Sequence, residues 1–350
     1  MKHGGNLDLI QNEYGISKNK IIDLSANINP IGMPKINIDL KILERYPDPE
    51  YKILRGSIGN YVGSNEKNII VGNGSSELIS NFIRVIGAPK TLIAMPTYSE
   101  YERESKLIGS TIKYYVAQEK NDFEIGIEDL LEALSCKPNL FILCNPNNPT
   151  GQNISNEKLE IIISYCKQNN IFVMIDEAYA EFFCESAINF INKFDNLVII
   201  RGISKFFSMP GLRLGYAVTS NLNLIAQVNK IKDPWSVNSL ANEIGKIIFT
   251  DKNYIAKTKN HIANEYDFIK NEFAKINNLK LYDTHANFFM GKILNNKSAT
   301  DLFRHLLKNN LLIRDLTDCK FLGNKFFRFS ISTHEINLLL AKQLKNFFER

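Results

Sequence analysis

The chain has 350 residues, of which 44% are hydrophobic and 23% are charged, a composition typical of a folded globular protein. Its formal net charge is only +5 and its lysines are scattered, so we expect no nucleic-acid partner. No apolar run approaches membrane-spanning length and no apolar signal segment follows the first residue, which predicts a cytoplasmic protein without a membrane partner. The five cysteines show no CxxC or Cys/His spacing, which indicates free thiols, a reducing compartment and no metal site.

Residues 1–45 are predicted to form an amino-terminal arm. A helix-like segment at 7–14 precedes a short strand at 21–24, and this strand opens into the sequence SANINP at 25–30. Asn, Ser and Pro form turns for local reasons, so this loop is either a simple turn or a lip over a site. The sequence RYPDP follows at 45–49, and its Tyr46 is by itself a half-buried aromatic residue.

Between residues 69 and 218, short apolar runs alternate with segments of helical periodicity. Buried strands are predicted at 69–71, 140–144, 171–175, 197–200 and 214–218. Helices are predicted at 77–86, 98–107, 127–134 and 157–168. This alternation predicts an α/β fold with a large domain at 46–250, in which helices flank both faces of a mostly parallel sheet.

Polar loops follow three of these strands, at the edge where ligands bind in open α/β sheets. The sequence GNGSSE follows the first strand, NPNNPTG the second and DEAY the third. A helix that begins at Ser75 would direct free N–H groups and its dipole toward an anion. Asp176 follows the third strand directly, so it is placed to contact a ligand.

The loop at 204–213 contains a single lysine, Lys205, beside Phe206 and Phe207. A lysine that is partly desolvated has a lowered pKa, so its neutral amine becomes available as a nucleophile. Ser204 and Arg213 flank it as donors suited to one phosphate. Taken alone, this pattern favours a solvated loop lysine, because single lysines and arginines are mostly exposed.

The carboxyl-terminal part is predicted to form a smaller domain at 251–350. Helical segments at 221–231, 238–248 and 253–276 lead into it, and its elements follow the order strand, helix, strand, strand, helix. Its last strand, at 326–331, alternates apolar residues with Arg328 and Ser330, as a half-buried strand would. Arg328 is therefore expected on the face opposite the apolar residues.

The ordered set of motifs GNGSSE, PTYSEY, NPNNPTG, DEAY, SKFFSMPGLRLGY and FRFS resembles the pyridoxal-phosphate enzymes of the aspartate aminotransferase superfamily. The resemblance spans nearly the whole chain. It implies an aspartate aminotransferase-like fold, with a large domain and a smaller α+β domain built from the carboxyl-terminal part and the amino-terminal arm. It also implies a homodimer with shared active sites and pyridoxal 5'-phosphate as cofactor.

The resemblance assigns a role to each matching residue. Lys205 would carry the cofactor covalently and move protons, and Asp176 would pair with the pyridine nitrogen. Tyr179 and Asn148 would hydrogen-bond the ring hydroxyl oxygen, and Tyr98 would stack on the ring. The cofactor phosphate would be held by a set of donors from both subunits: Ser75, Ser76, Ser204, Arg213, and Tyr46 reaching across the dimer interface.

Two subfamilies share these motifs, the threonine-phosphate decarboxylases of cobalamin biosynthesis and the histidinol-phosphate aminotransferases. HGGN at 3–6, SANINP, PWSVN at 234–238 and LIR at 312–314 resemble the decarboxylases, and Ile28 stands where the aminotransferases usually carry glutamate. We therefore expect decarboxylation of L-threonine O-3-phosphate to (R)-1-aminopropan-2-ol phosphate. Transamination of histidinol phosphate or a related amino acid, and decarboxylation of L-serine phosphate, are the alternatives.

The decarboxylase resemblance also implies the substrate contacts. Arg328 and Asn148 would hold the substrate carboxylate, and His3, Asn27 and Arg314 would lie near its phosphate. A noncatalytic cofactor-binding protein with this fold would be expected to carry a DNA-binding segment or a degraded lysine site, and neither is visible in the sequence.

Overall fold

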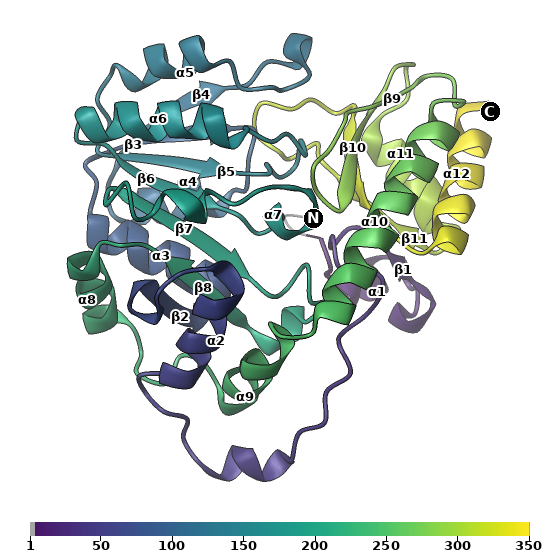
Figure 1. The fold of residues 1–350 in the computed structure, drawn as a ribbon. Coiled ribbons are helices and arrows are strands. Elements are labelled where there is room, and N and C mark those ends of the chain that lie inside the picture. Colours follow the sequence, from purple (N-terminus) through teal and green to yellow (C-terminus); the bar gives the residue numbers. More distant parts are fainter. Residues whose placement is uncertain (1–3, 350) are drawn as a thin grey trace.

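The computed structural model describes residues 4–349, which form a large sheet with its helices and a smaller carboxyl-terminal sheet (Figure 1). His3, predicted to lie near the substrate phosphate, is outside the described residues. The domain limits at 46 and 250 stay predictions. In the part of the chain that the structure describes, no helix is both long enough and apolar enough to cross a membrane.

The large sheet has seven strands in the order β2-β8-β7-β6-β5-β3-β4. Their bounds are β2 Ile69–Asn73, β3 Lys90–Met95, β4 Thr111–Val116, β5 Leu140–Cys144, β6 Phe172–Asp176, β7 Leu197–Gly202 and β8 Leu214–Val218. The neighbouring strands from β4 to β7 are parallel, and β8 is antiparallel to both β7 and β2. The mostly parallel sheet predicted from the sequence is therefore confirmed.

Helices cover both faces of this sheet because each central strand is apolar on both sides. In β5, Phe141 and Leu143 pack into one core, whereas Ile142 and Cys144 pack into the other. The helices of this part are α2 Lys52–Val62, α3 Gly74–Ile86, α4 Glu100–Leu107, α5 Ile127–Leu134, α6 Asn156–Gln168, α7 Ala180–Phe183, α8 Leu222–Ile231 and α9 Ser239–Ile248. Residues of α3 and α8 contribute to one core, and residues of α5 and α6 contribute to the other.

The smaller sheet has four antiparallel strands in the order β12-β13-β10-β9. The elements of this part of the chain are β9 Leu279–Leu281, β10 Phe288–Ile293, α11 Ala299–Leu307, β11 Leu311–Leu312, β12 Arg314–Asp315, β13 Phe326–Ser330 and α12 His334–Glu349. The long helix α10, Lys252–Phe273, packs against α12. The amino-terminal arm contributes α1, Leu7–Tyr14, and β1, Ile22–Asp23, which pairs in parallel with β11. The arm and the carboxyl-terminal part thus share a sheet, as the fold class predicted.

Two details of the predicted smaller domain are wrong. It begins with two strands, β9 and β10, before its first helix, because the chain folds back antiparallel after the short β9. The strand β13 is buried on both faces rather than half-buried. Its second face, which carries Arg328, is covered by the loop of Asn148 and by the arm at Ser25. Periodicity within one strand cannot reveal such a cover.

Beneath the polar edge of the large sheet lies a buried ion pair. Arg201 Nε and Nη2 donate to Glu177 Oε2 at 2.9 and 2.8 Å. The same carboxylate accepts from the Ser186 hydroxyl at 2.6 Å and the Ala187 amide at 2.7 Å. These contacts fix the segment that follows Asp176, because Glu177 is its immediate neighbour.

Replacing Arg201 with methionine is expected to lower the free energy of unfolding by about 3–5 kcal/mol, because the Glu177 carboxylate would stay buried without its counter-ion. Urea denaturation measures the change. The matched control is Lys167→Met, since the Lys167–Asp195 pair has side chains that are 48% and 62% exposed, and such pairs contribute at most about 1 kcal/mol. Equal losses in the two variants would contradict the assignment.

Candidate active site

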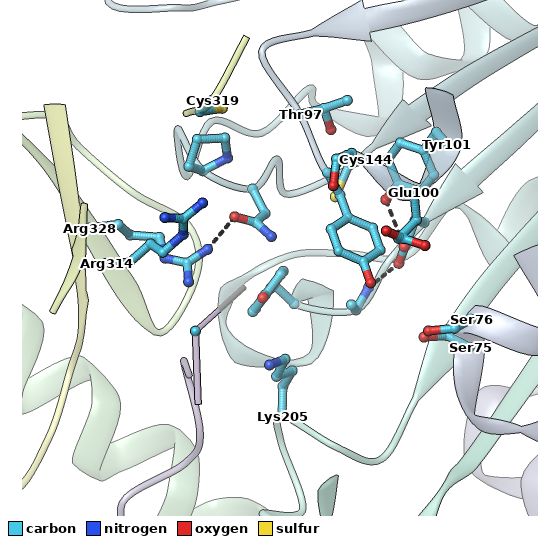
Figure 2. A pocket seen from close by; sticks show the side chains of 18 of the residues that line it. Ser75, Ser76, Thr97, Glu100, Tyr101, Cys144, Lys205, Arg314, Cys319 and Arg328 are labelled. Atoms are coloured by element: carbon cyan, nitrogen blue, oxygen red, sulfur yellow. Dashed lines mark hydrogen bonds between the residues drawn. The ribbon is translucent and has the colours of Figure 1, made fainter. Parts of the chain in front are cut away.

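A cavity of about 680 Å³ opens at the carboxyl ends of the parallel strands, between the large sheet and the smaller one. Most of the predicted site residues line it: Ser75, Ser76, Tyr98, Asn148, Asp176, Tyr179, Ser204, Lys205, Arg213, Arg314 and Arg328. Figure 2 shows Ser75 and Ser76 on one side of Lys205, with Arg314 and Arg328 on the other. The Lys205 amine therefore lies between a serine end and an arginine end of the cavity.

The Lys205 side chain points into this cavity from the loop after β7 (Figure 2). Its Nζ donates to the backbone oxygen of Ala26 at 2.6 Å, while Phe206 and Phe207 are fully buried in the core behind it. Burial, together with the nearby charge of Arg328, lowers the pKa of Lys205 to about 8. The amine is therefore a usable nucleophile near neutral pH.

The lowered pKa predicts how Lys205 reacts with acetic anhydride in the cofactor-free protein. The neutral amine is the reactive form, so the rate should rise as the pH rises through about 8, and it should level off above that. A lysine in a model peptide, with a pKa of about 10.4, should still be gaining reactivity there. Mass spectrometry of the Lys205 peptide measures the profile. A midpoint near that of the model peptide would contradict the burial of the amine.

Asp176 is buried at the end of β6, where Tyr101 and Cys144 approach it. The Tyr101 hydroxyl donates to Asp176 Oδ2 at 2.7 Å, and the amide of Ala178 donates to Oδ1 at 3.0 Å. Burial raises the pKa of Asp176 to about 6, although these two hydrogen bonds oppose the rise. A buried carboxylate of this kind is suited to pair with a cationic nitrogen that enters the cavity.

A polar wall lies between Asp176 and the arginine end. The buried Tyr179 hydroxyl accepts from Asn27 Nδ2 at 3.3 Å. Asn148 Oδ1 accepts from Arg328 Nη1, and the backbone oxygen of Ser25 accepts from Arg328 Nη2 at 2.7 Å. The loop after β5 and the amino-terminal arm thus orient the guanidinium of a residue from the smaller sheet.

The opposite end is built around the beginning of α3. Asn73, which precedes this helix, makes no side-chain capping hydrogen bond, so the first amides of the helix are available for an anion. Arg213 adopts a left-handed backbone with φ of +59°. A Cβ built on Gly74 would lie 2.2 Å from the Arg213 guanidinium, so only glycine leaves space for the arginine here. Ser204 also lines the cavity.

Arg314 and Arg328 face each other across two neighbouring strands. They are direct register partners in the antiparallel pair β12–β13, so their side chains leave the same face of the sheet a few ångströms apart. Both residues are buried. Burial lowers the pKa of Arg328 to about 10. The neighbouring charge of Arg314 also lowers this pKa, whereas Tyr179 raises it. Two neighbouring cations attract anions, and the Asp318 carboxylate already accepts a hydrogen bond from Arg314 Nη2.

Tyr46 lies apart from the cavity lining. Its side chain is 80% exposed and its ring lies 4.7 Å from that of Trp235. Asn27 contacts the site through Tyr179 and is not among the residues that line the cavity.

Sequence reasoning missed Tyr101, which directly contacts Asp176. A signal was present, since Tyr101 follows Tyr98 by three residues in the predicted helix 98–107, a spacing that puts two side chains on one face. In the structure, α4 begins only at Glu100. It also missed the charged outer rim of the cavity, which includes Glu102, Asp318 and Lys320.

Known proteins are similar to this chain over most of its length. The family model for aminotransferase class I and II matches residues 12–342. A protein of Caldanaerobacter subterraneus subsp. tengcongensis that is provisionally named a threonine-phosphate decarboxylase is 37% identical, covering 93% of this chain and 89% of that protein. The histidinol-phosphate aminotransferase of Clostridium novyi is 34% identical, covering 93% and 91%.

Among solved structures, the histidinol-phosphate aminotransferase of Clostridium acetobutylicum superposes with a TM-score of 0.88 at 32% identity, covering 93% of this chain and 98% of that one. Proteins named for decarboxylation and for transamination are thus similarly close. The fold, the family model and these relatives agree that the chain belongs to the aminotransferase class I and II family, whose enzymes depend on pyridoxal 5'-phosphate.

Proposed function

We propose that this enzyme decarboxylates L-threonine O-3-phosphate to (R)-1-aminopropan-2-ol phosphate and CO2 for cobalamin biosynthesis. The observation that carries the proposal is the cross-strand pair of Arg314 and Arg328 at one end of the cavity. Two buried guanidinium groups on the same face suit a small substrate with two anionic groups. Threonine phosphate carries a carboxylate and a phosphate only a few bonds apart, whereas histidinol phosphate carries a phosphate alone.

The residues present fit pyridoxal 5'-phosphate by the chemistry of their donors. The first amides of α3, with Ser204 and Arg213, offer an anion cradle for its phosphate, which a side chain at Gly74 would fill. Asp176 offers a buried carboxylate for its ring nitrogen, and Lys205 offers an amine for its aldehyde. When bound, the cofactor supplies an electron sink for the pair of electrons released at the substrate Cα.

Other proposed contacts complete the cofactor site. Ser75 and Ser76 supply the cradle amides, Tyr98 covers the ring, and Tyr179 and Asn148 hydrogen-bond its hydroxyl oxygen.

The residues around the substrate would determine which bond breaks. Arg328, held by Asn148 and Ser25, would fix the carboxylate, and Arg314 would fix the phosphate at the other end of the molecule. Anchoring at both ends sets the rotation about Cα, so the bond to the carboxylate can be aligned for cleavage. Lys205 Nζ is the proposed proton donor to Cα after CO2 leaves, because its pKa of about 8 suits proton transfer near neutral pH.

The proposed role of Tyr46 depends on a homodimer. Its 80% exposed side chain is available to a second protomer, and we propose that it reaches the cofactor phosphate bound by the partner subunit. The cytoplasmic location likewise stays a prediction.

Transamination is the second candidate, supported by the similarity to histidinol-phosphate aminotransferases. A keto acid such as 2-oxoglutarate also carries two anionic groups, so the arginine pair would serve it as well. This candidate requires a keto acid for sustained turnover, whereas the decarboxylase does not.

A panel of substrates tests the two-anion assignment. We expect L-threonine O-3-phosphate to exceed L-threonine, which lacks the phosphate, by at least about 10²-fold in kcat/KM, because the unphosphorylated molecule forms no charge-assisted hydrogen bonds with Arg314. L-Serine phosphate should be accepted more weakly, since one methyl group is worth about 1–3 kcal/mol in an apolar pocket. Equal rates for threonine and its phosphate would contradict the assignment of Arg314.

A further inference from the structure

The Arg314 guanidinium already has a carboxylate beside it. Its Nη2 donates to Asp318 Oδ1 at 2.5 Å, and its Nη1 donates to the backbone oxygen of Asp315. The Arg314 side chain is only 9% exposed, whereas that of Asp318 is 42% exposed. Asp318 also lines the cavity. An anion that enters the cavity and the Asp318 carboxylate therefore compete for one guanidinium group.

The neighbouring Arg328 is held differently. Its Nη1 and Nη2 donate to neutral oxygens of Asn148 and Ser25, and its Nε is buried without a hydrogen-bond partner among the described residues. The carboxylate of Asp23 acts on it only as a minor electrostatic influence. The two arginines therefore differ in charge balance, because only Arg314 has a carboxylate at hydrogen-bonding distance among these contacts.

The loop that carries Asp318 is anchored by contacts other than the Arg314–Asp318 pair. The Asp315 carboxylate accepts from the amide of Thr317 at 2.9 Å and from its hydroxyl at 2.6 Å. Lys320 Nζ donates to the Tyr114 hydroxyl of β4 at 2.8 Å and lies 3.2 Å from Glu102 of α4. The loop can therefore keep its place when Asp318 releases the arginine.

We propose that Asp318 is a specificity-determining residue that competes with the substrate phosphate for Arg314. This inference rests on the proposed function in that the substrate carries a phosphate. A phosphate monoester has nearly two negative charges above pH 7, and it offers three strong acceptor oxygens, so it displaces the partly exposed carboxylate. A ligand that carries only a singly charged carboxylate has the same charge as Asp318, so it does not displace Asp318 from Arg314. The pair Arg314–Asp318 thus selects for phosphorylated amino acids by rejecting weaker anions.

The test replaces Asp318 with asparagine, which keeps the shape and removes the charge. The probe is inorganic phosphate as a competitive inhibitor of the loaded enzyme at pH 8, with acetate as the singly charged comparison. We expect the inhibition constant for phosphate to fall about twofold to fivefold, since a partly exposed ion pair is lost. The constant for acetate should fall by at least as much, and kcat should change less than twofold.

Two control variants separate the local effect from a general change in charge. Asp318→Glu keeps the carboxylate and should stay within about twofold of the parent protein. Asp195→Asn removes an exposed carboxylate, 62% exposed and paired with Lys167, and should leave both inhibition constants unchanged. Unchanged or weaker phosphate binding in Asp318→Asn would overturn the inference, and so would equal tightening in Asp195→Asn.

The inference and the proposed function fail in distinguishable ways. If the parent protein releases no CO2 from threonine phosphate while Asp318→Asn still binds inorganic phosphate more tightly, the decarboxylase proposal fails and the role of Asp318 stands. If CO2 is released and the inhibition constants do not change in Asp318→Asn, the role of Asp318 fails and the decarboxylase proposal stands.

Discussion

Lys205→Ala is expected to abolish measurable turnover, with a loss of at least about 10³-fold, because the variant loses both the nucleophile and the proposed proton donor. The Lys205 amine lies in the cavity between the serine end and the arginine end (Figure 2). Steady-state kinetics measure the loss. The absorbance of the bound cofactor should also shift, since its aldehyde can no longer react with Lys205.

Lys205→Arg provides the matched comparison, because it keeps a cation in the cavity and lacks a usable amine. Both variants should be equally inactive. Added methylamine should partly restore proton transfer in Lys205→Ala, where space is left, and not in Lys205→Arg. Turnover of Lys205→Ala within about tenfold of that of the parent would contradict the assignment, because another residue would then act as the proton donor.

The second large effect concerns Arg328, whose replacement by alanine should lower kcat/KM by about 10²–10³-fold. The guanidinium is buried and aligned by Asn148 and Ser25, so a substrate carboxylate would lose a desolvated, oriented partner. Arg328→Lys should recover little of this loss, because an ammonium group lacks the planar pair of donors. Michaelis–Menten analysis with threonine phosphate measures both variants.

The control for Arg328 is Arg304→Lys, which alters an exposed arginine on α11 in the same sheet-and-helix unit. It should leave kcat/KM unchanged. If Arg328→Lys had the same kcat/KM as the parent protein, charge alone would be sufficient at this position. The proposal that the guanidinium aligns the substrate carboxylate would then be contradicted.

The sequence predicted the cofactor half of the candidate site more completely than the substrate half. Asp176 and Lys205 could be identified because each lies at or shortly after the end of an apolar strand, β6 or β7, and strand ends meet at one edge of a parallel sheet. Arg314 was identified through resemblance alone. Its position opposite Arg328 depends on the register between β12 and β13, and register is not encoded in either strand by itself.

Other features depend on contacts between distant segments. Arg328 was expected on a non-core face, but that face is buried. Ser25 and Asn148 contact Arg328 there, although they precede it by 303 and 180 positions in the sequence. Tyr101 reaches Asp176 across 75 positions. No local pattern measures such distances, although Tyr98 and Tyr101 are near enough in the sequence for their rings to meet, with centroids 5.6 Å apart.

Product analysis with L-threonine O-3-phosphate, the loaded enzyme and no keto acid is the measurement that tests the central claim most directly. The account predicts CO2 and 1-aminopropan-2-ol phosphate in equal amounts, over many turnovers for each active site. Absence of CO2, together with turnover of histidinol phosphate once 2-oxoglutarate is added, would contradict it and assign the protein to transamination.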